Sequence, residues 1–387
     1  MTDNGRRSKK TAVNAAQERA RITQSGKTIL RLAQRSESIT QPEIVRSSGM
    51  SQQTVSRLVN SLLSSGALIE GKRSSGGKRG QPSMSVGVSS GYCYSFGVAM
   101  MTDSIAVTLM DFSGRALEQV EQPMVAMSKP AVTTFLTQSL RRFCQKRSIP
   151  KEKVVGIGVG ISGYCLGGEG MYNTPRNLDD WAMVNIAEVL GDALGFEVCV
   201  ENDANAAAMG EAFVGAGKNY SSLAYIYIAA GIGGGVIIDH ELMRGHNGNG
   251  GEIGLLLPTS VYPMPQLEMM RQIIIENGVE LQGISDMLTR FDINWPGVDE
   301  WIARTQGSIS LLASSLAAIL DPQAIVIGGR IPRDLADKII SHIEIFDDVR
   351  RTQPRKLPRL LSSSTVGDAC SIGAAALAFN ELFFSDR

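Results

Sequence analysis

The chain has 387 residues, of which 43% are hydrophobic and 20% charged, a composition typical of a globular protein with more than one core. It has no run of about 18 apolar residues that could span a membrane, and its N-terminus is polar and basic, so we expect a cytoplasmic protein. The five cysteines lie far apart, without the paired spacing of a zinc or redox site, and we interpret them as buried thiols.

The charge is distributed unevenly, although the formal total is zero. Residues 1–90 carry 15 Lys and Arg against 5 Asp and Glu, so the rest of the chain is acidic by the same margin. A basic segment attached to an acidic body indicates a polyanionic partner for the basic segment.

The first part of the chain predicts a winged helix-turn-helix domain over residues 17–88. Residues 1–16 are polar and basic without periodicity, which predicts a flexible basic tail. Apolar residues at helical spacing predict a first helix over 17–34. Two short strands, 67–70 and 83–88, enclose a Gly- and Lys-rich loop over residues 71–82 that would form a basic wing.

Capping signals place two further helices between that first helix and the wing. Thr40 precedes a proline, and Glu43 follows three residues later, which is a helix start of the capping-box type. Gly49 interrupts the pattern, and Ser51 caps a third helix over 52–64 whose apolar residues form one stripe. Two helices joined by a short turn are typical of a helix-turn-helix, whose later helix enters the major groove of DNA.

Polar side chains near the start of the third helix face away from its apolar stripe, and three basic side chains belong to the wing. Gln bonds adenine and Arg bonds guanine in a bidentate manner, while basic side chains of a wing contact phosphates or the minor groove. The predicted DNA-binding residues are Gln52, Gln53, Thr54, Ser56, Arg57, Arg73, Lys78 and Arg79. A helix-turn-helix that contacts protein is the alternative, and the charge imbalance favours DNA.

Beyond residue 89, short apolar runs alternate with helical stretches, which predicts an α/β body. The expected helices include residues 131–146 and 307–320, and the expected strands are 94–99, 105–110, 154–161, 223–230, 236–238 and 324–327. Glycines directly follow several of these strands, where an α/β fold brings the backbone close to a ligand.

Six motifs occur in a fixed order along this body. They are GIGVGISG (156–163), YNTPRNL (172–178), ENDANA (201–206), GIGGG (231–235), GNGGEIG (248–254) and IVIGG (325–329). With the helix-turn-helix, they make residues 17–387 resemble the regulator branch of the ROK family (repressor, open reading frame, kinase), related to the N-acetylglucosamine and xylose repressors.

The resemblance implies a two-lobed actin-like ATPase (ribonuclease H-like) sugar-kinase fold behind the winged helix-turn-helix. The first α/β lobe is expected over residues 89–200, together with a C-terminal helix over 368–387. The second lobe is expected over 201–367 and would carry the effector site and an oligomerisation surface.

The resemblance also implies where a sugar would bind. Asn202 and Asp203 match the family's pair that bonds sugar hydroxyls, with Asp203 at the position of the kinase general base, and two glutamates match further sugar-contacting carboxylates. A carboxylate and an amide at a strand end suit a polyol, because they bond several hydroxyls in fixed geometry. Taken singly, each acid is as compatible with a surface position or a helix cap. The predicted effector-binding residues are Asn202, Asp203, Glu252, Glu268, Gly163 and Asn173.

The nucleotide side departs from the family's kinase pattern. In residues 96–104, Ala99 stands where the kinases have Asp, and Met101 and Asp103 stand where Gly and Thr approach phosphate. Because phosphoryl transfer requires metal and donor groups to neutralise charge, we do not expect ATP binding or kinase activity. The second phosphate loop, 231–235, is largely kept, with Ala230 in place of Thr, and is equally compatible with a tight turn between strands.

The family's zinc site is also incomplete. Leu255 stands at the position of the zinc-binding His, and residues 256–266 contain no Cys, so we expect no zinc and a shifted sugar preference. His240 and His246 lack partners at metal-ligand spacing, and we interpret them as ordinary loop residues.

The favoured interpretation is a transcription regulator, a repressor of carbohydrate-related genes, that binds double-stranded operator DNA as a homodimer or homotetramer. A sugar or sugar derivative bound between the lobes would change the separation of two DNA-binding domains. Two alternatives stay open: a ROK-type sugar kinase with an accessory DNA-binding domain and Asp203 as base, and a DNA-binding protein whose body only oligomerises.

Overall fold

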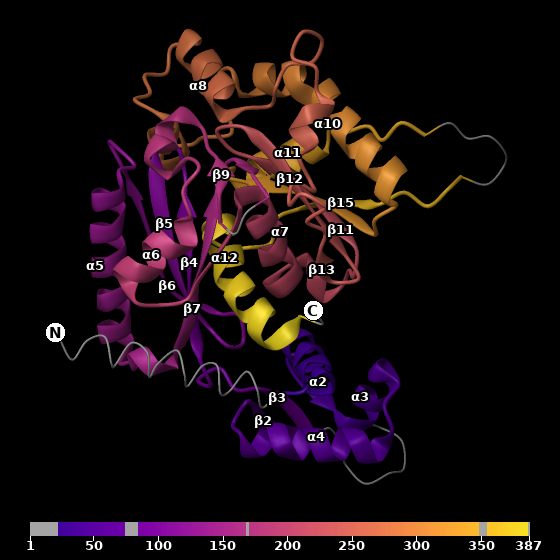
Figure 1. Cartoon of the computed structure of the whole chain (residues 1–387). Helices are drawn as coiled ribbons and strands as arrows, with labels where there is room; N and C mark the ends of the chain where they lie inside the picture. Colours follow the sequence, from indigo (N-terminus) through magenta and orange to yellow (C-terminus); the bar gives the residue numbers. More distant parts are fainter. Residues whose placement is uncertain (1–21, 74–83, 168–169, 348–353, 386–387) are drawn as a thin grey trace.

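The computed structural model describes residues 22–73, 84–167, 170–347 and 354–385. These residues form an N-terminal domain and two α/β lobes, with the N-terminal domain below the lobes in the view of Figure 1. No helix of this described part is long and apolar enough to cross a membrane.

The N-terminal domain combines three helices with a small antiparallel sheet of order β1-β3-β2. Its elements are α2 (Gln24–Arg35), β1 (Ile39–Thr40), α3 (Gln41–Ser48), α4 (Gln52–Ser64), β2 (Leu68–Arg73) and β3 (Met84–Val88). The bounds predicted for the third helix are confirmed, as is the capping box, in which the Thr40 N–H donates to Glu43 Oε2 at 2.8 Å.

Three details of this domain differ from the sequence prediction. The first helix begins at Gln24, because the side chain of Thr23 accepts the N–H of Gly26 and caps it there; residues 17–21 lie outside the described part. Strand β1 was not predicted, and it forms because Ile39 pairs with Val86. Strand β2 continues to Arg73, so the loop predicted to begin at residue 71 starts later.

The two lobes contain sheets of the same strand order. In each sheet, an antiparallel three-strand meander is extended from its first strand by two parallel strands (Figure 1). The first sheet has the order β6-β5-β4-β7-β10, with β4 (Tyr94–Met100), β5 (Ser104–Asp111), β6 (Ala116–Pro123), β7 (Val154–Ile161) and β10 (Val198–Asn202). The second has the order β13-β12-β11-β14-β15, with β11 (Leu223–Ile228), β12 (Ile232–Ile238), β13 (Glu241–Leu242), β14 (Ala324–Gly329) and β15 (Arg359–Ser362). This repeated order is the two-lobed actin-like arrangement that was predicted.

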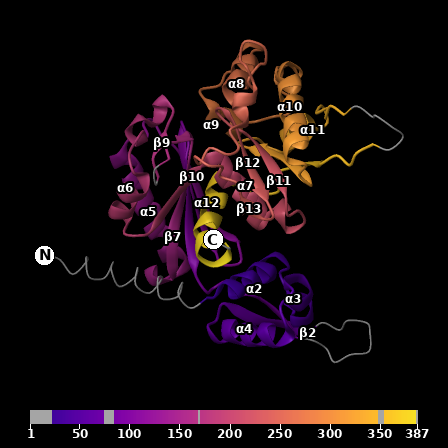
Figure 2. The same cartoon turned by 45° about the vertical axis from the view of Figure 1, so that its right-hand side comes forward.

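Two helices lie between the sheets: α7 (Asp203–Val214) and α12 (Ala369–Phe379), which Figure 2 shows near the centre of the molecule. Glycines allow this close packing. A Cβ on Gly97 or Gly158, in the first sheet, would stand 1.8 Å from a backbone oxygen of α12. A Cβ on Gly235 in β12 would stand 2.5 Å from the Ala208 Cβ of α7. Small residues therefore allow each helix to lie flat against a sheet.

The remaining helices cover the outer faces of the sheets and complete two apolar cores. Around the first sheet lie α5 (Lys129–Arg147) and α6 (Ile186–Leu194), and around the second lie α8 (Leu267–Glu276), α9 (Ile284–Thr289), α10 (Val298–Leu320) and α11 (Arg333–Ile340). Short pieces link them: β8 (Tyr164–Cys165), β9 (Tyr172–Asn173), η1 (Lys151–Lys153), η2 (Arg176–Trp181), η3 (Ala216–Lys218), η4 (Ile253–Leu256) and the π-helix η5 (Asn380–Phe384).

The strands predicted for the body are all present, with different ends in the second lobe. Strand β11 stops at Ile228, and β12 begins at Ile232, four residues before the predicted start. Most of the GIGGG motif is therefore strand, because it pairs with β11 from Ile228↔Ile232 onward.

Candidate functional site

A cavity of about 480 Å³ lies where the carboxyl ends of the central strands of both sheets meet. Some of the residues that line it follow directly after β4, β7, β10, β11 and β14, and others belong to strands β8 to β12 or to the loops beside them. Ligands of open α/β sheets bind at this edge, because the loops there converge from several strands.

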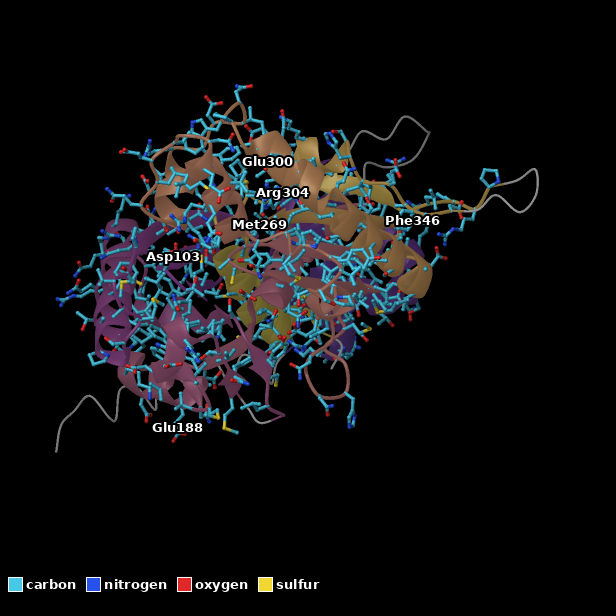
Figure 3. All side chains as sticks on the ribbon, turned by 90° about the horizontal axis from the view of Figure 1, so that it is seen from above. Asp103, Glu188, Met269, Glu300, Arg304 and Phe346 are labelled. Carbon is cyan, nitrogen blue, oxygen red and sulfur yellow. The ribbon has the colours of Figure 1, made fainter. Side chains whose placement is uncertain are left out.

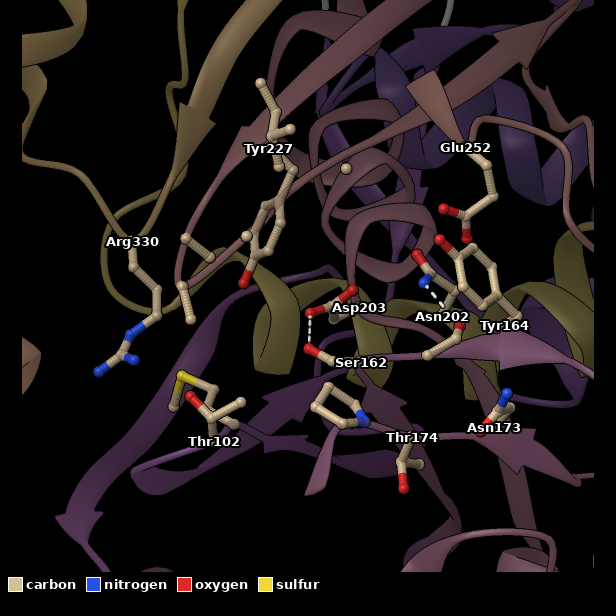
Figure 4. A pocket seen from close by; sticks show the side chains of 18 residues that line it. Thr102, Ser162, Tyr164, Asn173, Thr174, Asn202, Asp203, Tyr227, Glu252 and Arg330 are labelled. Atoms are coloured by element: carbon tan, nitrogen blue, oxygen red, sulfur yellow. Dashed lines mark hydrogen bonds between the residues drawn. The ribbon is translucent and has the colours of Figure 1, made fainter. Parts of the chain in front are cut away.

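Asn202 and Asp203 form the floor of this cavity at the junction of β10 and α7 (Figure 4). The side-chain oxygen of Asn202 accepts the N–H groups of Ala204 at 2.9 Å and Asn205 at 3.2 Å, so it caps α7. Its amide nitrogen donates to the carbonyl oxygen of Gly163 at 3.2 Å. Asn202 therefore holds the start of α7 against the loop that follows β7.

Two carboxyl groups face the cavity in surroundings that favour their neutral forms. Burial raises the pKa of Asp203, and the hydrogen bond from the Ser162 hydroxyl opposes this shift only in part. Burial, followed by the charge of Asp203, raises the pKa of Glu252 to about 7. Near neutral pH, such a pair can accept or donate hydrogen bonds to the hydroxyl groups of a polyol.

The structure brings together five of the six predicted effector-binding residues. Gly163, Asn173, Asn202, Asp203 and Glu252 all line the cavity. The conformation at Gly163 requires glycine: its φ is +139°, and a Cβ would stand 2.5 Å from the carbonyl oxygen of Asn173.

The sixth, Glu268, does not line this cavity. It lies in the first turn of α8, where its carboxylate accepts the Arg271 Nε–H at 2.9 Å. That hydrogen bond lowers the pKa of Glu268. The family match placed Glu268 near the sugar, but its spacing to Arg271 favours an ion pair along the helix surface.

A buried ion pair beneath the cavity was not predicted from the sequence. Glu201 accepts the Arg244 Nε–H at 2.6 Å, and its other oxygen accepts the Asn202 N–H at 3.0 Å and the Asn205 amide at 3.1 Å. It therefore supports the cap of α7 from below. The acidic residue that opens the ENDANA motif was the one sequence signal for this ion pair. Its cationic partner, Arg244, lies 43 residues later in the sequence, where no motif indicated it.

The turn after β4, which holds phosphates in the family's kinases, here carries a link between the lobes. Ala99 is buried in β4, and Met101 lines the cavity. Asp103 lies where the first lobe meets the second (Figure 3). Its carboxylate accepts Arg330 Nη1 at 2.6 Å and the Ser285 hydroxyl at 2.8 Å.

The second phosphate motif is a strand with a short loop before it. Of residues 231–235, Gly233 to Gly235 pair within the β11–β12 hairpin, and residues 229–231 form the loop. Only Gly231 of this motif lies in the loop, so the interpretation of the whole motif as a tight turn does not hold: Ile232 to Gly235 belong to β12.

The position of the family's zinc site has apolar side chains. Leu255, in η4, is 71% exposed, and the neighbouring Leu257 is buried. Within the described residues, no three His, Cys, Asp or Glu side chains gather as metal ligands, and this donor set does not fit zinc.

On α4, the polar residues predicted to read DNA form an outward face. Gln52, Gln53 and Arg57 are exposed, and Thr54 and Ser56 are half-buried. The opposite face buries its valines and Leu62 against the other helices. Arg73 ends β2, whereas Lys78 and Arg79 lie outside the described residues.

Comparison with family models assigns both parts of the chain. Residues 22–68 match the model "Winged helix-turn-helix DNA-binding", and residues 95–265 match the model "ROK family". The chain therefore carries a winged helix-turn-helix domain followed by a ROK family domain.

Two relatives show how far along the chain the sequence similarity extends. An uncharacterized protein, y4fQ, of Sinorhizobium fredii is 28% identical over 89% of this chain and 87% of its own length. The xylose repressor of Bacillus spizizenii is 30% identical over 218 residues, which is 56% of each protein. The alignment thus spans about half the length of that repressor.

Solved structures share the fold. A ROK family transcriptional regulator, described as a homolog of the E. coli MLC protein, superposes with a TM-score of 0.65 at 18% identity, over 95% of this chain and 97% of its own. A ROK family glucokinase from Streptomyces griseus superposes with a TM-score of 0.59 at 22% identity, over 73% and 98%. The superposition on the regulator covers the N-terminal domain as well as the lobes. Both solved structures confirm the predicted fold class.

The ROK domain and the winged helix domain share one apolar core. Helix α2 packs on η5, and buried side chains of both domains, such as Leu30, Phe213 and Phe384, belong to a single cluster. The buried Gln34 amide donates to the carbonyl oxygen of Phe213, near the end of α7, at 2.9 Å. Arg31 adds an ion pair with Glu241 at 3.3 Å.

The two histidines considered in the sequence lie in loops beside these regions. His240, next to β13, lies near α2, and burial followed by the nearby charges of Arg35 and Arg31 lowers its pKa to about 4. His246 follows in the next loop.

Proposed function

We propose that this ROK protein is a sequence-specific DNA-binding transcription regulator whose affinity for DNA is controlled by a sugar bound in the interlobe cavity. The observation that carries the proposal is α7, a single helix with the cavity at its first residue and the winged helix domain at its last turn. At about 1.5 Å per residue, it joins the two over about 18 Å.

On the DNA side, the proposal rests on the outward face of α4. Gln52, Gln53 and Arg57 lie on the helix that follows the turn, which is the position of a recognition helix. The excess of Lys and Arg in the first 90 residues adds attraction to phosphates. Thr54, Ser56 and Arg73, with Lys78 and Arg79 of the wing, complete the proposed contact set.

On the effector side, the proposal rests on the cavity. Its amides, hydroxyls and two carboxyls suit a polyol, and one relative is a xylose repressor. A sugar that contacts Asp203 would bias the position of α7, and Gln34 would pass that change to α2. A coupling of about 1–3 kcal/mol gives a 5- to 150-fold change in DNA affinity.

We further propose repression as the direction of control and a homodimer, or a homotetramer, as the assembly. Operator half-sites repeat at a fixed distance, so a two-fold assembly would place two α4 helices in successive major grooves. Size-exclusion chromatography with light scattering measures this assembly directly.

The test is fluorescence anisotropy with labelled DNA from upstream of the chain's own gene, at two salt concentrations, with a panel of sugars. We expect salt-dependent binding that prefers this DNA over random DNA and changes with one sugar. The variant Asp203→Asn should keep the DNA affinity and lose the sugar response. Equal affinity for specific and random DNA would contradict the proposal.

Asp203 favours a second candidate function, a sugar kinase, because its carboxyl lies in the cavity and accepts a hydrogen bond from Ser162. Against it, the turn after β4 places Asp103 where a phosphate would need neutralising groups. ATP turnover with a hexose that disappears in Asp203→Asn would establish the kinase; no turnover with either protein supports the regulator.

A further inference from the structure

Tyr227, in β11, contributes a hydroxyl group to the cavity that none of the sequence motifs indicated. Its side chain is 2% exposed and lines the cavity, and the hydroxyl points inward between Asp203 and Arg330 (Figure 4). Within the described residues, this buried hydroxyl has no hydrogen-bond partner. Buried hydroxyl groups are nearly always hydrogen-bonded, so one that faces a cavity indicates a partner supplied by a ligand.

The cation beside Tyr227 is not available to an anionic ligand. Arg330 is the single Lys or Arg among the described residues that line the cavity, and its side chain is 5% exposed. Its guanidinium pairs with Asp103 at 2.6 Å and Glu121 at 3.2 Å, and it also donates to Ser104 and Ser285. Two carboxylates therefore balance one cation here.

The rest of the cavity adds acidic groups. Asp203 and Glu252 face it on the side away from Arg330, and each has a raised pKa. A phosphate monoester carries about −1.5 to −2 charges at neutral pH. In this cavity it would find no free cation to neutralise that charge, because Arg330 is already paired with Asp103 and Glu121. An uncharged hydroxyl or amide group needs no such neutralisation and can pair with the Tyr227 hydroxyl.

We propose that Tyr227 determines the specificity of the cavity by hydrogen-bonding an uncharged sugar, and that the corresponding sugar phosphates are excluded. This inference rests on the proposed function, because it concerns the effector of the same site. It names the class of that effector as an unphosphorylated sugar.

The test is calorimetric titration of the full-length protein with D-xylose, D-glucose and N-acetyl-D-glucosamine, with the 6-phosphates of the last two, and with inorganic phosphate. We expect at least one free sugar to bind and every phosphate to bind at least about tenfold more weakly. Tyr227→Phe removes only the hydroxyl and should weaken sugar binding roughly 5- to 30-fold.

Tyr225 provides a matched control on the same face of the same strand. Its ring lies 6.2 Å from that of Tyr227, but its hydroxyl lies against Gly328 and it does not line the cavity. Tyr225→Phe should therefore bind the sugar like the unmodified protein. Asp103→Asn removes one carboxylate beside Arg330 and should raise the affinity for the sugar phosphates.

Three results would overturn the inference: no free sugar binds, a phosphate binds more tightly than its parent sugar, or Tyr227→Phe binds as tightly as Tyr225→Phe. DNA binding of the same variants, measured by anisotropy on the upstream fragment, separates this from the proposed function. A protein that binds the sugar through Tyr227 but has no DNA preference refutes the regulator and leaves this inference intact.

Discussion

The hydrogen bond between Gln34 and the carbonyl oxygen of Phe213 permits a direct test of coupling between the two domains. Gln34→Ala removes the donor at 2.9 Å and leaves a buried carbonyl group without its partner. Loss of such a bond costs about 1–3 kcal/mol, the same size as a typical allosteric coupling free energy. We therefore expect the sugar-dependent change in DNA affinity to fall by at least about fivefold.

The assay compares DNA affinity by anisotropy with and without a bound sugar, and stability by thermal melting. Arg31 still pairs with Glu241 in this variant, so the two domains should remain docked. Gln138→Ala, an exposed position on α5, serves as the control and should leave both measurements unchanged. If Gln34→Ala melts earlier but keeps the full sugar response, the bond only stabilises the fold and our reasoning about α7 is wrong.

Three further predictions concern pH, DNA and the interlobe ion pair. Because burial raises the folded-state pKa of Glu252 from 4.5 to about 7, the native protein retains this proton longer than the unfolded chain. Its stabilising contribution should be complete below pH 4.5 and lost as the pH rises through 7, by at most about 3 kcal/mol and by less to the extent that solvent screens the group. Glu252→Gln should flatten this part of the melting profile, and parallel profiles of the two proteins would contradict the prediction. Arg57→Ala should weaken specific DNA binding by about 1–3 kcal/mol in anisotropy titrations, whereas Asn60→Ala on the same helix should not, and equal losses would argue against base recognition. Arg330→Gln leaves Asp103 without its cation and should lower the free energy of unfolding by about 3 kcal/mol in urea titrations, more than Asp103→Asn; an unchanged free energy of unfolding in Arg330→Gln would show that the pair is not stabilising.

Local signals predicted the N-terminal domain and most of the strands well, for a physical reason. The cap at Ser51 and the apolar stripe of α4 act within one or two helical turns, so adjacent residues contain the information. The same holds for β7, whose predicted bounds match. The early start of β12 could not be read locally, because it depends on pairing with β11.

By itself, the sequence determined the order of domains, the class of fold and the motifs that meet at the cavity, because each depends on short-range patterns or on a family resemblance. Only the tertiary structure decided which distant side chains touch. Arg330 meets Asp103 across 227 residues, and Gln34 meets Phe213 across 179. Such contacts depend on how sheets and helices pack in space, and no local pattern encodes that arrangement.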